Sequence, residues 1–360
     1  MLKSHHSHDQ NIYFLLLNFS LQMKTRQTYF FLLIPLYIAS FCCSSFAHGQ
    51  NTAKDSLVNI SLKYLRQNDK EMFRATYSQL FVHYALESEG IDMKRMLERN
   101  DKDSLCFYLN LLMKDRSIDA LCYRVLTDGK YKKVFSELPC KDLCKKWVDS
   151  VSMVPDAQLR DELWDIMFRD QGIRALFIAL PPNTSDSIRK KVRGEILSID
   201  GQNTDRVMQI LDISGKWPGK TLIGEMADQS LWLCLQHADQ KPEVAKKYLP
   251  MLHEAVMQKR SDPMYYAYLF DRIRMNEGKE QLYGTQVYQK TLEGGKVKCF
   301  VVPIEDVEEV DKRRMEMGME SISDYLKGMG MTWSLQEYKK TLEQNWMYYR
   351  LRSKPQNIGS

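Results

Sequence analysis

Two stretches of the chain concentrate side chains that could perform acid–base chemistry or bind an anion. In the first, "LWLCLQHADQ", His237 and Asp239 follow a run of apolar residues. In the second, residues 271–286 ("DRIRMNEGKEQLYGTQ"), Asp271 and Arg272 begin a segment rich in amides and hydroxyls. A histidine that a carboxylate orients can act as a general acid or base, and an arginine can stabilise an anion. These four side chains are therefore the candidate catalytic residues.

The first stretch lies at the end of a helix predicted over Thr221–Asp239. Because successive residues of a helix turn by about 100°, the side chains of His237 and Asp239 point in different directions. A partner for His237 then has to come from another element, and Asp271–Arg272 is the obvious source. The candidate ligand-binding residues lie in and around the two stretches: Trp217, Glu225, Gln236, Gln281, Tyr283, Thr285 and Gln286.

The same residues also have a purely structural interpretation. His237 can bond the exposed carbonyls of a helix end, and Asp271 can pair with a residue of its own helix. Judged on spacing alone, the structural interpretation is favoured over the chemical one. The sequence contains no glycine-rich phosphate loop, no serine nucleophile elbow and no two-histidine metal motif. We therefore predict no cofactor and no metal site.

Apolar residues recur at three- and four-residue steps over most of the chain, which predicts a mainly α fold of antiparallel helices. Among these are two separate helices, "TSDSIRKKVRGEILSID" and "NTDRVMQILDISG". The period changes to two in "YGTQVYQK" and "VKCFVVPIE", which are separated by the turn-forming "TLEGG". This change predicts one small β-hairpin at about 283–303.

The first 47 residues have the layout of a secretory signal peptide. Lys24 and Arg26 precede the apolar run "YFFLLIPLYIASFCC", and small residues lead to Ala47. Met23 is the expected start, because it places these charges next to the apolar run. We expect the mature chain in the periplasm or outside the cell.

A membrane attachment is disfavoured. The apolar run is shorter than the ~20 residues of a spanning helix, and Pro35 interrupts it. A lipoprotein signal is less consistent still, because Phe41 precedes Cys42 where a small residue is expected. No later segment is apolar enough to span a bilayer, so no membrane span is expected after cleavage.

The charge balance argues against nucleic acid as a partner. The complete chain carries 51 Lys and Arg against 46 Asp and Glu, a net charge of +5 at pH 7. Residues 1–47 hold Lys3, Lys24, Arg26 and Asp9, so they contribute +3 − 1 = +2 and leave +3 for the rest. Both signs are interspersed, whereas nucleic-acid binding needs a basic face or stripe.

Six cysteines remain after the predicted cleavage: Cys106, Cys122, Cys140, Cys144, Cys234 and Cys299. Export permits disulfides, and an even number is compatible with them. Cys234 and Cys299 lie in apolar runs, where free cysteine behaves as a small hydrophobic residue. Cys140 and Cys144 share one helical face, but no nearby His or Cys pair completes a metal site. Packing is favoured over a disulfide, and a disulfide over a metal.

Changes in pattern divide the chain into a signal peptide (1–47), a helical region (48–154), a second domain (155–330) and a helical tail (331–360). Within the second domain, five segments stand in a specific order: "ELWDIMFRDQGIR", "WPGKTLIGE", "LQHAD", "YLFDRIRMNEGKEQLYGTQ" and "PIEDVEEVDKRRMEMGM". Over about 157–327 this order resembles an uncharacterised bacterial family, domain-of-unknown-function family six-six-two-four. Lys216 stands where that family usually has glycine. The resemblance implies no activity or substrate, but its polar segments coincide with the two stretches.

Two functions remain open, and whether the protein is an enzyme is left undecided. The favoured one is a binding or interaction protein of the cell envelope, whose ligand is an unidentified small molecule or envelope protein. The alternative is a hydrolase-like enzyme that uses His237, Asp271 and Arg272. A closed polar cluster with its groups satisfied would favour binding or structure, and an open cleft beside His237 would favour an enzyme.

Overall fold

The computed structural model describes residues 52–87, 96, 99, 101–114, 119–127, 129, 132–291 and 297–353. The predicted signal peptide and its start at Met23 lie outside these residues. The chain forms two compact units. One, called here the helical unit, comprises Ala47–Cys234 and Met257–Ser261, and the other, the hairpin unit, contains Leu235–Val256 and Asp262–Ser360.

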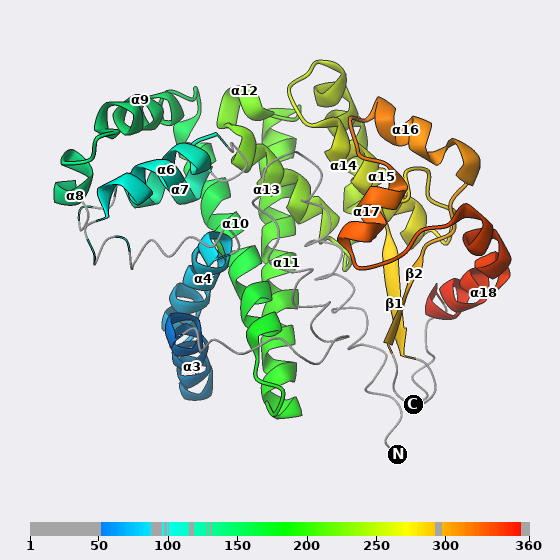
Figure 1. The fold of residues 1–360 in the computed structure, drawn as a ribbon. Helices are drawn as coiled ribbons and strands as arrows, with labels where there is room; N and C mark the ends of the chain where they lie inside the picture. Colours follow the sequence, from blue (N-terminus) through cyan, green and yellow to red (C-terminus); the bar gives the residue numbers. More distant parts are fainter. Residues whose placement is uncertain are drawn as a thin grey trace. The chain divides into compact units, whose positions relative to one another are not determined.

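The helical unit is built around one long helix, α10 (Ala157–Ala179), which packs against α4 and α11 (Figure 1). Its other helices are α3 (Thr52–Gln67), α4 (Lys70–Glu87), α6 (Lys102–Leu112), α7 (Asp119–Thr127), α8 (Lys132–Ser136), α9 (Lys141–Ser152), α11 (Asp186–Ser214), α12 (Lys220–Ile223) and most of α13 (Glu225–Gln236). The α10 helix begins at the N-cap Asp156, whose carboxylate accepts from the Leu159 amide at 2.9 Å. It ends just before Pro181–Pro182, which cannot continue a helix.

The two helices predicted between Thr184 and Gly215 are one continuous helix, α11, so that prediction was wrong. Gly201 lies between the two predicted segments, and glycine costs a helix ~1 kcal/mol relative to alanine. Buried apolar residues nevertheless continue at helical spacing on both sides of it, from Ile196 and Ile199 to Val207. Their burial outweighs the glycine penalty, and α11 ends only at Gly215, which takes the left-handed C-cap conformation.

The helix predicted over Thr221–Asp239 is shorter than expected. Gly224 has φ +81° and separates the short α12 from α13. The α13 helix ends at Gln236, so His237 and Asp239 follow the helix instead of forming its last turn.

The hairpin unit contains α14 (Pro242–Met257), α15 (Pro263–Asn276), β1 (Val287–Thr291), β2 (Val297–Val301), η5 (Val307–Glu309), α16 (Val310–Glu316), α17 (Ile322–Gly328) and α18 (Leu335–Ser353), with Met257 itself grouped in the helical unit. The strands are antiparallel, in a register that pairs Val287 with Val301. Both strands fall within the range predicted for the hairpin. The mainly α fold with one small hairpin is thus confirmed for the described residues.

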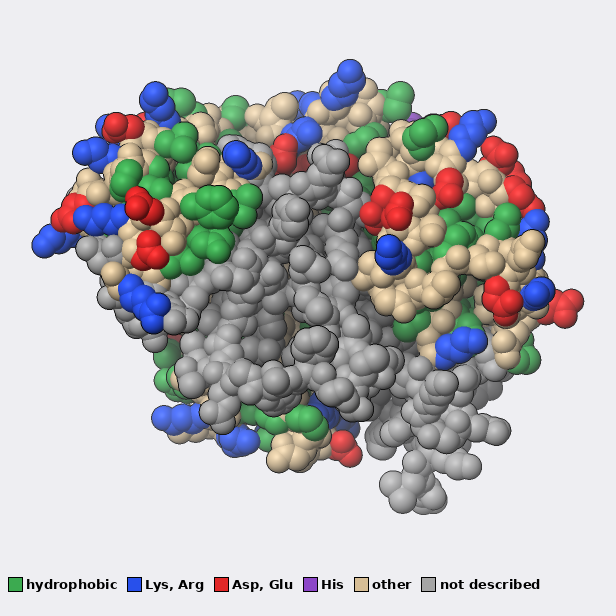
Figure 2. Space-filling view, viewed as in Figure 1, with side chains coloured by type: hydrophobic (Ala, Val, Ile, Leu, Met, Phe, Trp, Pro, Cys, Tyr) green, Lys and Arg blue, Asp and Glu red, His purple; other side chains and the backbone are tan. Residues whose placement is uncertain are grey.

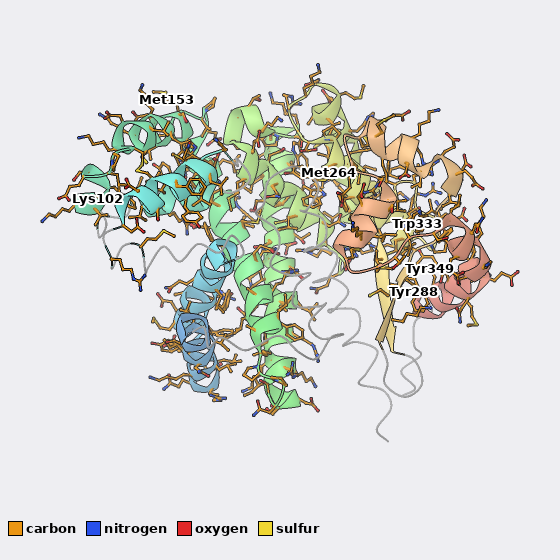
Figure 3. The ribbon with its side chains drawn as sticks, in the orientation of Figure 1. Lys102, Met153, Met264, Tyr288, Trp333 and Tyr349 are labelled. Carbon is orange, nitrogen blue, oxygen red and sulfur yellow. A yellow bond between two sulfur atoms is a disulfide. The ribbon has the colours of Figure 1, made fainter. Side chains whose placement is uncertain are left out.

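An aromatic cluster joins the hairpin to α18. Tyr288 stacks on Phe300 with 5.4 Å between ring centroids, and Tyr349 lies beside Tyr288 at 6.3 Å (Figure 3). The Tyr288 hydroxyl donates to the Asn345 carbonyl at 2.9 Å, and the Tyr349 hydroxyl to that of Met275 at 2.6 Å. Because each buried phenol has a partner, these contacts hold α18 against the hairpin and the end of α15.

The surface fits the charge pattern of the sequence. On the face drawn in Figure 2, lysine and arginine side chains lie among acidic ones over the described residues. Among those residues, no helix is both long enough and apolar enough to cross a bilayer.

The compact units do not divide at residue 154. Gly172 of α10 lies directly against α4, where an added Cβ would stand 2.4 Å from the Tyr77 carbonyl oxygen and 2.7 Å from the Ser78 Cα. Glycine is needed here for the close approach of two backbones. The boundary predicted at residue 154, with independent folding of 155–330, stays a prediction.

We expect Gly172→Ala to lower the free energy of unfolding by about 1–3 kcal/mol, because overpacking forces α4 and α10 apart. Gly194→Ala on α11 is the matched control, since an added Cβ there meets nothing within 4 Å. That control should be neutral or stabilising by about 0.5–1 kcal/mol. Urea unfolding of both variants measures the difference. Equal stability of the two would contradict the packing of α4 on α10.

Candidate functional site

The second polar stretch closes around the carboxylate of Asp271, a fully buried residue of α15. Its Oδ1 accepts from the backbone N–H of Leu282 at 2.7 Å, and the N–H of Tyr283 lies 3.2 and 3.1 Å from its two oxygens. Its Oδ2 also accepts from the backbone N–H of Thr285 at 3.1 Å and from the Thr285 hydroxyl at 2.9 Å. One carboxylate therefore accepts from three backbone N–H groups and one hydroxyl of the loop.

Gln281 and Gln286 close the same loop at its ends. The Gln281 amide donates from Nε2 to the carbonyls of Gln286 at 2.9 Å and Val302 at 2.8 Å, and its Oε1 accepts from the Gln286 N–H at 2.7 Å. The Gln286 side chain donates to the Thr285 hydroxyl at 2.9 Å. The Gln281 amide thus substitutes for backbone pairing where the chain enters the hairpin.

Gly284 lets the loop turn around the Asp271 carboxylate. Its φ of +67° is in the left-handed region, and an added Cβ would stand 2.7 Å from Cδ1 of Ile322. On either side of it, Arg314 donates to the Tyr283 carbonyl at 2.7 Å and the Tyr325 hydroxyl donates to the Thr285 carbonyl at 2.8 Å. The "YGTQ" segment is therefore held from α15, α16 and α17.

The chemistry left to Asp271 is limited. Burial raises the pKa of its carboxyl, while the hydrogen bonds from Thr285, Leu282 and Tyr283 act in the opposite direction. Both oxygens are occupied by donors of the loop. The predicted role of Asp271, to orient the imidazole of His237, would have to compete with these bonds.

The two stretches meet through Asp239 and Arg272. Arg272 is 1% exposed, and burial lowers the pKa of its guanidinium, whereas the charge of Asp239 and the phenol of Tyr325 raise it. His237 is buried as well, at 3% exposure. Asp239 and Arg272, one from each stretch, thus interact electrostatically.

Gln236, the last residue of α13, differs from Gln281 and Gln286, whose side-chain amides each form at least one hydrogen bond. It is 1% exposed. Within the described part of the chain, neither its Nε2 nor its Oε1 has a hydrogen-bond partner. A buried amide left unpaired costs ~1–3 kcal/mol, so a group of this kind calls for an explanation.

Trp217 and Glu225 belong to the helical unit, and the other predicted site residues to the hairpin unit. The buried Trp217 donates from Nε1 to Asp228 at 2.5 Å, and the second oxygen of Asp228 accepts from the Ser261 hydroxyl at 2.7 Å. Glu225 is half-buried, with its carboxylate 3.9 Å from the ammonium of Lys220. The contacts of Trp217 are therefore structural, because they join its indole to Asp228 of α13.

The helical unit contains a second buried polar cluster, which the sequence analysis did not single out. Arg174 of α10 donates to Asp170, one turn earlier, at 2.9 Å and to Asp200 of α11 at 2.7 Å. Gln171 donates to the other oxygen of Asp170. Burial lowers the pKa of Arg174, but the two carboxylates outweigh it and raise that pKa above its ordinary value. Burial and the same carboxylates raise the pKa of the Cys234 thiol.

Part of this cluster had a signal in the sequence. Asp170 and Arg174 stand four residues apart inside the apolar helix "LWDIMFRDQGIRALFIAL", where unpaired charges would be too costly to bury. That spacing could have predicted their ion pair. Asp200 is 26 residues further along the chain, and only the packing of α11 on α10 brings it to Arg174.

The profile of a family of unknown function, DUF6624, matches residues 155–337. The chain belongs to this family. The match confirms the resemblance seen in the order of the sequence segments, and it gives the chain no activity. The DUF6624 segment includes both polar stretches and the cluster around Arg174, and it leaves α3 to α9 outside. No curated protein and no solved structure matches the chain.

We expect Asp271→Asn to lower the free energy of unfolding by about 1–3 kcal/mol, because an amide NH₂ would face backbone N–H groups that need an acceptor. Asp306→Asn makes the same chemical change at an exposed position whose left-handed backbone asparagine tolerates. That control should stay within about 0.5 kcal/mol of the parent. Thermal and urea unfolding measure the stability of both variants. If both were as stable as the parent, Asp271 would not stabilise the loop.

A second pair of variants tests the ion pairs. Arg174→Met should cost about 3–5 kcal/mol, because it leaves two buried carboxylates without their guanidinium. Arg206→Met removes an ion pair with Glu162 whose side chains are 42% and 35% exposed, and should cost at most ~1 kcal/mol. Urea unfolding of both variants measures the difference. Similar losses of unfolding free energy would show that burial does not make the Arg174 ion pairs more stabilising than an exposed pair.

Proposed function

We propose that this protein is an exported binding protein of the cell envelope, and that its hairpin unit holds a small polar ligand with an anionic group. The observation that carries the proposal is the buried amide of Gln236. Its donor and acceptor atoms lack partners among the described residues, and a bound ligand would satisfy both.

The neighbouring charges support an anionic ligand. Gln236 stands three residues before Asp239, whose charge acts on the guanidinium of Arg272. A buried guanidinium is a strong donor to carboxylate or phosphate oxygens, and an amide offers both a donor and an acceptor that fix the orientation of a ligand. Binding sites of this kind use a few polar groups within an otherwise buried environment.

The contacts of Asp271 favour binding over a hydrolase. The alternative needs a carboxylate to orient His237 as a general acid or base. Asp271 instead uses its oxygens to accept from the backbone of the 282–285 loop and from the Thr285 hydroxyl. A closed cluster of this type stabilises a fold and leaves recognition to neighbouring groups.

Binding can be tested by thermal shift of the mature chain against a panel of small carboxylates and phosphates. We expect one or more of them to raise the melting temperature of the parent. Gln236→Leu should lose that rise, yet melt at or above the ligand-free parent, because it removes an unpaired buried amide. Gln336→Leu, at an exposed position of α18, is the matched control and should keep the rise.

Two results would overturn the binding proposal. One is a parent that responds to no compound while Gln236→Leu loses stability, since the amide would then be structural. The other is a response that Gln236→Leu retains in full. Turnover of a responding compound by the parent, lost in His237→Ala with the fold intact, would support the hydrolase instead.

Export is tested separately. Cell fractionation followed by N-terminal sequencing should find a mature chain that begins between His48 and Asn51. The proposal fails if the chain stays uncleaved in the cytoplasm.

A further inference from the structure

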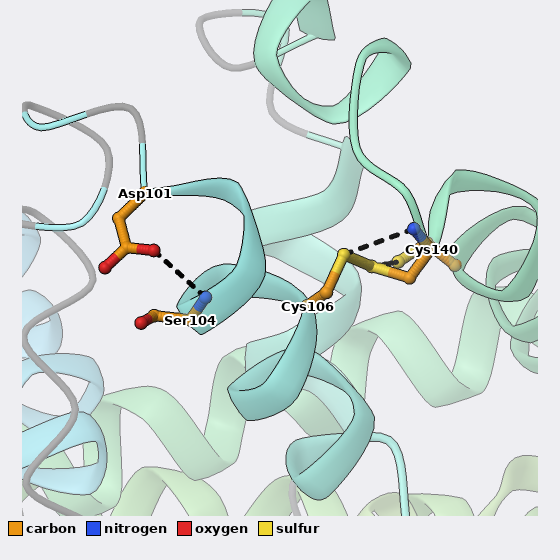
Figure 4. The surroundings of a disulfide bond; sticks show 5 residues. Asp101, Ser104, Cys106 and Cys140 are labelled. Carbon is orange, nitrogen blue, oxygen red and sulfur yellow. Dashed lines mark hydrogen bonds between the residues drawn. A yellow bond between two sulfur atoms is a disulfide. The ribbon is translucent and has the colours of Figure 1, made fainter.

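Four cysteines of the helical unit lie close together, and only two of them are bonded. Cys106 of α6 and Cys140, the N-cap residue of α9, form a disulfide across 34 residues of sequence (Figure 4). The packing favoured for all six cysteines was wrong for these two. It was right for Cys122, Cys144 and Cys234, which are free and buried.

Cys144 stands next to the disulfide with a free thiol. One helical turn after Cys140, its Sγ lies 3.9 Å from the Cys140 Sγ. Cys122 is a further neighbour: burial raises the pKa of its thiol, and Cys144 raises it further, across the contact between α7 and α9. A third sulfur within van der Waals contact of a disulfide is the arrangement from which thiol–disulfide exchange begins.

We propose that Cys144 exchanges with this disulfide, so that Cys140 alternates between Cys106 and Cys144 as its partner. The Cys144 thiolate attacks the Cys140 Sγ, a Cys140–Cys144 bond forms and the Cys106–Cys140 bond breaks. Cys106 leaves as a thiolate and takes up the proton that Cys144 released. The numbers of disulfides and of thiols stay the same, so the step needs no oxidant or reductant.

One hydrogen bond favours Cys106 as the leaving group. The backbone N–H of Cys140 donates to the Cys106 Sγ at 3.2 Å, which stabilises negative charge on that sulfur. Burial raises the pKa of the Cys144 thiol, so the attacking thiolate is scarce and exchange is slow at neutral pH.

The exchange would move a reactive thiol outward. Cys144 is 5% exposed, whereas Cys106 is half-buried. A thiol released at Cys106 is therefore more accessible to an external disulfide or alkylating reagent than the one at Cys144. The cluster is a reversible modification site whose reactive residue appears only after exchange.

The full oxidised chain is incubated with a maleimide without reductant, quenched in acid and mapped by mass spectrometry. Trypsin cleaves after Lys141, so Cys140 and Cys144 fall on different peptides. We expect time-dependent labelling of Cys106 together with a Cys140–Cys144 disulfide. Cys144→Ser should lose this labelling entirely, and Cys299→Ser, a free thiol of the hairpin unit, should leave it unchanged.

A second variant keeps the test decisive. In Cys106→Ser treated with glutathione disulfide, Cys140 and Cys144 should pair with each other instead of keeping a glutathione adduct. The proposal is overturned if Cys106 of the parent stays unlabelled. It is equally overturned if Cys106 is labelled as fast in Cys144→Ser as in the parent. It also fails if Cys106→Ser, shown to be folded by its circular dichroism spectrum, ends with glutathione on Cys140 and a free thiol on Cys144.

Discussion

The hydrogen bonds that the Asp271 carboxylate accepts from the backbone of Leu282, Tyr283 and Thr285 set the geometry of the hairpin unit. A buried carboxylate without donors and buried N–H groups without acceptors would each be costly. Here each satisfies the other, and the loop gains a fixed conformation at the point where it enters β1. Gln281 and Gln286 extend the same principle to the ends of the loop.

The helical unit handles buried charge in another way. Arg174 bridges Asp170 of its own helix and Asp200 of α11, so the charges compensate one another directly. Such a cluster fixes the rotation of α10 relative to α11, because the guanidinium meets both carboxylates in only one arrangement. Gly172, two residues before Arg174, allows the backbone of α4 to pack directly against α10.

Against this background, Gln236 is informative because it breaks the pattern. The Asp271 carboxylate, the Thr285 hydroxyl and the Nε2 groups of Gln281 and Gln286 bond within the protein, whereas both polar atoms of Gln236 lack a partner among the described residues. Proteins retain an uncompensated buried group when it serves a purpose that stability does not. Recognition of a ligand is such a purpose, and it requires no nucleophile.

Local pattern alone determined the helices, the hairpin, the membership of the family and the two segments in which polar groups concentrate. Helical and strand periods arise between residues a few positions apart, so a single sequence contains them. Tertiary structure decided the continuity of α11 through Gly201, the partner of Cys106, and the pairing of Arg174 with Asp200. It also decided that Asp271 serves a loop, because a carboxylate in a sequence has no partner until folding brings the donors to it. Each of these outcomes depends on burial or on a contact between distant residues, and neither exists before the elements pack.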